Sequence, residues 1–169
     1  KEKKNFIQFF WISYLLFVIF IFGFSLRIGG DWNNYSTLFY LVHGVIAEID
    51  QTWKYTPRVE YTVDYYDAPV FYFFNYIVGL FFTNFIFFKI ISSIVFIYSI
   101  NKFCNLFNDS KYIVFGFFMP YLGIVVSLGY IRQSLAISLF AIAIYYFLSN
   151  KEKISLPFMV LSFLSHLVI

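Results

Sequence analysis

Long apolar stretches that are almost free of charge recur along the chain and constrain its fold more than any other feature. The first, residues 6–26, carries no charged side chain over a length that crosses a bilayer as a helix. Similar stretches occupy residues 84–100, 112–128, 131–148 and 154–169. Because a backbone in lipid must satisfy its own hydrogen bonds, the pattern predicts one membrane domain, an all-α, polytopic transmembrane helical bundle with about five spans.

The composition excludes the main soluble classes of protein. Hydrophobic residues make up 61% of the sequence and charged residues only 12%, too few to cover the surface of a soluble domain. No basic tract indicates nucleic-acid binding. The lone Cys104 cannot form an internal disulfide, and we expect neither a metal ion nor a cofactor. The sequence therefore predicts a multi-pass protein whose first partner is the lipid bilayer.

Residues 27–82, between the first two predicted spans, form a predicted outer interfacial segment. Apolar residues at helical spacing within residues 31–50 predict an amphipathic helix lying along the membrane surface. Residues 68–82 are short for a span and predict a re-entrant or interfacial helix. If they do not cross, seven of the twelve basic residues lie inside, as the positive-inside rule requires. If they do cross, two of the lysine-bearing loops move outside. The seven are Lys1, Lys3, Lys4, Lys102, Lys111, Lys151 and Lys153.

Under this topology the arginines gather at the outer face. Arg27 follows the first span and Arg132 opens the fourth, while His166 lies near the outer end of the fifth. Most of the acidic residues, including Asp31, fall in the same outer segment. Polar groups collected at one face favour surface chemistry over a transport path, which would need polar residues along the spans.

Three short motifs, in order along the chain, carry a resemblance to a known family. They are Arg27-Ile-Gly-Gly-Asp31-Trp-Asn-Asn-Tyr35, Tyr130-Ile-Arg132-Gln133-Ser-Leu-Ala136 and Ser165-His166. Together they resemble the EpsG-like exopolysaccharide polymerases, relatives of the Wzy-type O-antigen polymerases. The segment 67–71 departs from the family's Pro-Gly-aromatic turn, because the glycine is replaced here. Members of the family are considerably longer, so we expect this chain to be an N-terminal fragment, truncated at the C-terminus.

The resemblance implies an enzyme of the bacterial plasma membrane that acts at its outer face in exopolysaccharide, capsule or O-antigen biosynthesis. It would join oligosaccharide repeat units carried on undecaprenyl pyrophosphate, and the resemblance also implies other polysaccharide assembly proteins as partners. Two alternatives stay open: another lipid-phosphosugar-dependent glycosyltransferase or ligase, and, outside the enzymes, a flippase for lipid-linked oligosaccharides. A further alternative is that the chain is a structural membrane subunit without catalytic activity.

Four residues are predicted to be catalytic, and each has a simpler interpretation. The planar fork of Arg132 suits a pyrophosphate, but an arginine there can also reach lipid headgroups. Arg27 can serve the same purpose or offset the C-terminal dipole of the first span. Asp31 can act as a general base, hold Arg27 or cap the next helix. His166 lies in an apolar run, where a histidine is either functional or bonded to a neighbouring helix.

Four further residues are predicted to bind the sugar units. Trp32 and Tyr35 can stack on pyranose rings, whereas Tyr130 and Gln133 flank Arg132 and can bind hydroxyl groups. An aromatic belt is the competing interpretation for the aromatic residues at this depth. The acidic pair Glu48 and Asp50 is too weak a signal to predict a metal site.

Overall fold

The computed structural model describes residues 2–25, 32–42 and 68–166, and all of its regular structure is helical. The prediction of an all-α, polytopic helical protein is confirmed for these residues. The helices are α1 (Glu2–Phe24), α2 (Trp32–Val42), α3 (Pro69–Phe81), α4 (Phe85–Cys104), the 3₁₀ segment η1 (Asn105–Ser110), α5 (Lys111–Phe118), the π-helical segment η2 (Met119–Ser127), α6 (Ile131–Leu148) and α7 (Glu152–Ser165).

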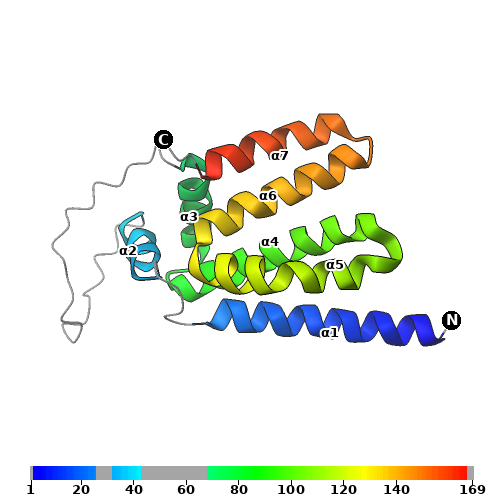
Figure 1. Cartoon of the computed structure of the whole chain (residues 1–169). Coiled ribbons are helices and arrows are strands. Elements are labelled where there is room, and N and C mark those ends of the chain that lie inside the picture. The colour runs from blue at the N-terminus through cyan, green and yellow to red at the C-terminus, as the bar shows by residue number, and fades with distance from the viewer. Residues whose placement is uncertain (1, 26–31, 43–67, 167–169) are drawn as a thin grey trace.

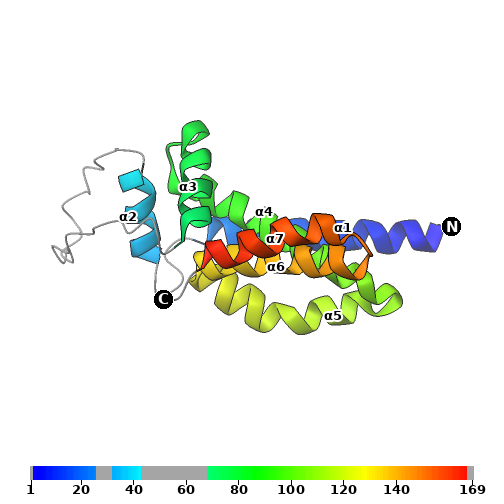
Figure 2. The ribbon, with the colours of Figure 1, turned by 90° about the horizontal axis from the view of Figure 1, so that it is seen from above.

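Helices α1, α4, α5, α6 and α7 run side by side, and the short helices α2 and α3 lie at one end of them (Figure 1). Helix α4 packs against α1 on one side and α6 on the other, and α6 packs against α7. Helices α5 and η2 return beside α4, whereas α2 and α3 lie at the end where α1 and α7 finish and α4 and α6 begin (Figures 1 and 2). We call this the site end of the bundle and the opposite one the lysine end.

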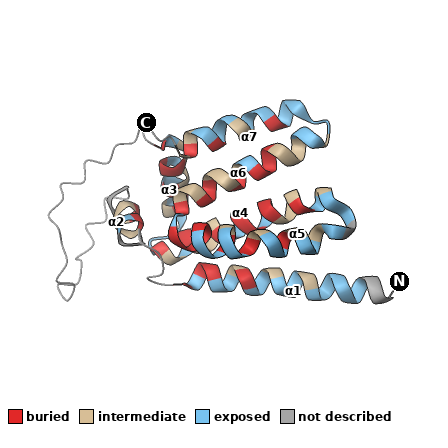
Figure 3. Ribbon diagram, viewed as in Figure 1, coloured by how far each residue is buried: buried red, intermediate tan, exposed pale blue. Residues whose placement is uncertain are grey.

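Three of the described helical stretches are long and apolar enough to cross a membrane. They are Asn5–Phe24, Phe85–Asn108 and Ile131–Leu148. Much of α1 is exposed in Figure 3, and its exposed residues include large apolar ones such as Phe9, which is 65% exposed. Such a surface suits lipid rather than water. The chain is therefore a multi-pass membrane protein, while the five predicted spans and the outer interfacial segment stay predictions.

The predicted span at residues 112–128 is divided in the structure into α5 and the π-helical segment η2. The second residue of η2 is Pro120, which has no N–H to donate to the preceding turn. A proline inside a helix forces the hydrogen-bond register to change, and a π-helical turn is one way to absorb it. The amphipathic helix predicted within residues 31–50 is observed as α2 as far as Val42, and the rest lies outside the described residues.

The hydrophobic core consists of two clusters. One joins α1, α4 and α5 along the length of the bundle, with Phe22, Phe96 and Phe115 at its centre. The second lies at the site end and is built from buried residues of α2, α3, α4 and α6. We call it the site-end cluster. Its members are Tyr35, Phe39, Ala68, Phe71, Tyr72, Val78, Phe85, Phe88, Ile131 and Leu135.

Helices α6 and α7 form a hairpin held by two hydrogen bonds between helices. Ser155 Oγ donates to the carbonyl of Ala143 at 2.8 Å, and Ser162 Oγ donates to the carbonyl of Ala136 at 2.8 Å. Small residues at the contact let the two backbones approach closely, as in other membrane bundles. The hairpin therefore fixes the last turn of α7 beside the first turns of α6.

Removing the Ser162 hydroxyl is expected to loosen this hairpin. Ser162→Ala loses a bond between helices, so we expect it to lower the free energy of unfolding by about 1 kcal/mol. Ser165→Ala is the matched control, because Ser165 Oγ donates to Leu161 within its own helix. Thermal unfolding in detergent measures both variants. A larger loss for Ser165→Ala would contradict the assignment of Ser162 as the bond that joins the helices.

The lysine end gathers the basic loops. The start of α1, the turn at η1 and the turn between α6 and α7 all lie there (Figure 1). Lys102 Nζ lies 5.1 Å from the ring centre of Tyr145 and 5.3 Å from that of Tyr146, so it links α4 to the end of α6. Because α6 begins at the site end, Arg132 lies at the end of the bundle opposite these lysines.

Candidate functional site

Arg132 and His166 meet at the site end although they are far apart in sequence. Arg132 is the second residue of α6, and His166 directly follows the last residue of α7. The antiparallel hairpin brings these two helix ends together. The two side chains lie close enough for the positive charge of Arg132 to act on the imidazole of His166.

Each side chain of this pair has a buried nitrogen without a hydrogen-bond partner among the described residues. These atoms are Nε of Arg132 and Nδ1 of His166. Burying a polar group without a partner costs free energy, so such groups are uncommon unless they serve a ligand or another role. The bond to a neighbouring helix, the simpler interpretation of His166, is not made by its Nδ1 among the described residues.

The position of Arg132 in the first turn of α6 suits an anion. The N-terminal end of a helix carries a partial positive charge, and its first N–H groups lack acceptors within the helix. A cation at this position is disfavoured by the dipole unless an anion lies nearby. The guanidinium and the helix end thus present the same sign to a phosphate group.

The predicted sugar-binding residues are placed differently from one another. Tyr130 precedes α6 and is 40% exposed, and Gln133 in the first turn is half-buried. Tyr35 is buried in the site-end cluster, with its ring 5.7 Å from that of Phe71. Tyr35 therefore packs α2 onto α3, while Tyr130 and Gln133 lie beside Arg132.

The remaining predicted site residues lie outside what the structure describes. Arg27 and Asp31 are in the segment 26–31, and the side chain of Trp32, the first residue of α2, is likewise outside. The weak acidic pair at residues 48 and 50 is also outside. Among the described residues, no group of three His, Cys, Asp or Glu side chains is placed to hold a metal ion.

Lys89 is a buried cation at the site end that the sequence analysis passed over. It is 2% exposed, and its Nζ donates to the carbonyl of Ser25 and, at 2.9 Å, to the Ser25 hydroxyl. Ser25 follows the end of α1, so the ammonium group caps the negative end of this helix. The sequence signal was available, because Lys89 is the one charge within an apolar stretch, where charges are costly.

Close packing holds the same end of α1 on α4. A Cβ atom added to Gly23 would lie 2.8 Å from Cγ1 of Ile90 and 3.1 Å from its Cα. The absent side chain therefore lets the two helix backbones approach each other next to the Lys89–Ser25 contact. Both features fix the point from which the segment carrying Arg27 and Asp31 continues.

A side chain at position 23 is expected to push α1 away from α4. Gly23→Leu should lower the free energy of unfolding by about 1–3 kcal/mol, because the backbone of Ile90 cannot give way as a flexible side chain would. Gly116→Leu is the matched control, since a Cβ there meets nothing within 4 Å. Thermal unfolding in detergent compares the two variants, and equal losses would refute the proposed close contact.

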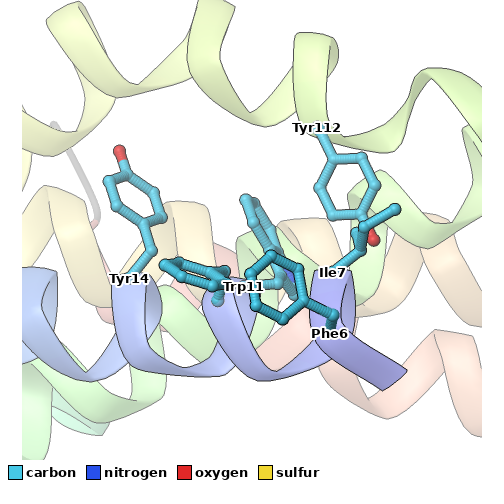
Figure 4. A pocket seen from close by; sticks show the side chains of 6 residues that line it. Phe6, Ile7, Trp11, Tyr14 and Tyr112 are labelled. Carbon is cyan, nitrogen blue, oxygen red and sulfur yellow. The ribbon is translucent and has the colours of Figure 1, made fainter. Parts of the chain in front are cut away.

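A groove at the lysine end does not contribute to this site. Aromatic and aliphatic side chains of α1 and Tyr112 of α5 line it (Figure 4). Trp11 forms its floor, with its ring 4.7 Å from that of Tyr112 and its Nε1 donating to Asn101 Oδ1 at 3.1 Å. The lining residues include no charged group, so the groove offers nothing to hold a phosphate.

Comparison with known proteins identifies the family to which the chain belongs. The EpsG family matches the chain over residues 8–169, which is almost its whole length. No curated protein and no solved structure matches. Membership of this family suggests a role in polysaccharide biosynthesis. A multi-pass helical bundle with these motifs in order, matched over nearly all of its residues, is a member of the EpsG family.

Proposed function

We propose that the protein is a polysaccharide polymerase of the bacterial plasma membrane. It joins oligosaccharide repeat units carried on undecaprenyl pyrophosphate at the outer face. The observation that carries the proposal is the pairing of Arg132 with His166 at one end of the bundle, each with a buried nitrogen free of described partners. Family membership supports the same substrate class.

The proposed reaction needs a group that stabilises the departing pyrophosphate and a group that accepts a proton. A hydroxyl oxygen of the acceptor unit attacks the anomeric carbon of the growing chain, and the bond from that carbon to the pyrophosphate oxygen breaks. Arg132 and the start of α6 stabilise the negative charge on undecaprenyl pyrophosphate as it leaves. His166 accepts the hydroxyl proton. Arg27 is proposed to bind the same pyrophosphate, and Asp31 to orient the acceptor or Arg27.

The remaining predicted contacts complete the proposed site. Tyr130 and Gln133 flank Arg132, so they are proposed to bind hydroxyl groups of the sugar that reacts. Trp32 is proposed to stack on the acceptor unit, and Tyr35, which is buried, to hold α2 in place on α3. The lipid tail of the carrier would lie against the apolar outer surface of the bundle, as the bilayer itself does.

Polymerisation by purified components tests the proposal. Proteoliposomes with the full-length protein receive the host's undecaprenyl-pyrophosphate-linked repeat unit and no nucleotide sugar. The expected result is a ladder of longer chains with one undecaprenyl pyrophosphate released for each bond formed. Growth only after a nucleotide sugar is added would indicate another glycosyltransferase. Movement of the intact unit across the bilayer without bond formation would indicate a flippase. Either outcome would refute the proposal.

A further inference from the structure

A fully buried asparagine lies on α3 with its whole carboxamide unpartnered. Asn75 is 0% exposed, and neither its Oδ1 nor its Nδ2 has a hydrogen-bond partner among the described residues. A buried amide that loses its hydrogen bonds to water and gains none is strongly disfavoured. Asn75 therefore stands out from the other buried polar residues, such as Ser138, whose hydroxyl is bonded to a carbonyl of its own helix.

The inner face of α3 places Asn75 against the site end. Phe71 and Val78 lie one helical turn to either side of it on the same face and belong to the site-end cluster. The ring of Phe71 is 5.8 Å from that of Phe88 on α4. The same cluster contains Ile131, the residue directly before Arg132.

Helix α3 also packs against α7, the helix that His166 follows. In Figures 1 and 2, α3 lies across the end where α6 begins and α7 ends. Four of the five buried polar atoms without described partners therefore belong to Asn75, Arg132 and His166, on helices that meet at this end. The fifth is the hydroxyl of Ser92 on α4. Their convergence is independent of the sequence motifs, none of which includes Asn75.

The chemistry of the carboxamide indicates what it would bind. A phosphate group only accepts hydrogen bonds, so it could satisfy Nδ2 and would leave Oδ1 unpaired. A pair of sugar hydroxyls, or an acetamido group, both donates and accepts and can satisfy the two atoms together. The outer face of α3 is apolar and exposed at Phe73, Ile77 and Leu80, which suits lipid. The polar atom pair thus faces the bundle and not the bilayer.

On the basis of the proposed function, we propose that Asn75 is a specificity-determining residue that hydrogen-bonds the sugar of the lipid-linked unit beside the pyrophosphate held by Arg132. Because its side chain is fully covered, the side chains that cover Asn75 must move when the sugar binds. Arg132 thus binds the pyrophosphate that all such carriers share, and Asn75 binds the sugar attached to this pyrophosphate.

Asn75→Leu tests this role, because leucine has the same branched side chain of four heavy atoms without the polar pair. Initial rates in proteoliposomes give KM for the lipid-linked repeat unit and Ki for undecaprenyl pyrophosphate, which carries no sugar. We expect KM to rise at least tenfold, Ki to stay within twofold and the thermal midpoint to stay equal or rise. Asn75→Asp keeps an acceptor but loses the donor, so its KM should also rise.

Several outcomes would overturn the inference. An unchanged KM in Asn75→Leu would show that the sugar does not contact this residue. A fall in the thermal midpoint with unchanged KM would assign Asn75 to a structural bond with another part of the chain. An equal rise in KM and Ki would show that Asn75 binds the pyrophosphate and not the sugar. If wild-type proteoliposomes form no polymer, the proposed function itself is wrong. If the wild type forms polymer and Asn75→Leu has the same KM, only the role of Asn75 is wrong.

Discussion

Arg132→Lys in the full-length protein is expected to lower the rate of polymerisation about 100-fold or more, with single repeat units accumulating on the lipid carrier. Lysine keeps the positive charge and the position at the start of α6 but lacks the planar fork that pairs two phosphate oxygens. The loss should therefore appear in the transfer step. Chain length on gels and mass spectrometry of the lipid-linked units measure it.

Lys153→Ala provides the control for this variant. Lys153 is an exposed cation near the start of α7, at the lysine end, so its loss should leave chain length unchanged. Membrane insertion of both variants should match the wild type, because neither position carries a described contact that holds two helices together. Chains of normal length made by Arg132→Lys would show that the reaction does not need the guanidinium of Arg132.

His166→Ala is expected to lower turnover by about 10²–10⁴-fold, the range typical of a lost general base. The proton acceptor must be neutral to work. Activity that depends on this group should therefore decline as the pH falls and the imidazole becomes protonated. The profile of kcat/KM against pH measures this decline.

Much of the fold could be predicted from the sequence, because few backbone conformations satisfy their hydrogen bonds in lipid. An apolar stretch must become a helix in a bilayer, so the helices could be predicted from composition and length. The motif around Arg132 and the apolar run before His166 predicted their neighbouring helices, and alternation of direction then placed both at one end. Pro120 could be seen in the sequence, but the π-helical segment around it could not be predicted, because a helix can accommodate a proline in several ways.

The contacts of Lys89 and Asn75 could not be predicted from the sequence. Both residues lie in apolar stretches, and their meaning depends on which helix each one faces. Lys89 meets Ser25 from a position far away in sequence, and Asn75 is buried because α3 lies across the bundle instead of along it. Tertiary packing decides which helix a side chain contacts, and the spacing of apolar residues along the sequence does not reveal this packing.

Labelling from outside the cell tests the central claim that the chemistry lies at the outer face. Single cysteines replace the exposed residues Tyr130 and Lys151 in a full-length Cys104→Ala background, and intact cells receive a membrane-impermeant maleimide. The topology predicts that position 130 reacts in intact cells and that position 151 reacts only after permeabilisation. Labelling of position 151 in intact cells, with position 130 protected until permeabilisation, would place Arg132 and His166 in the cytoplasm and contradict the proposed function.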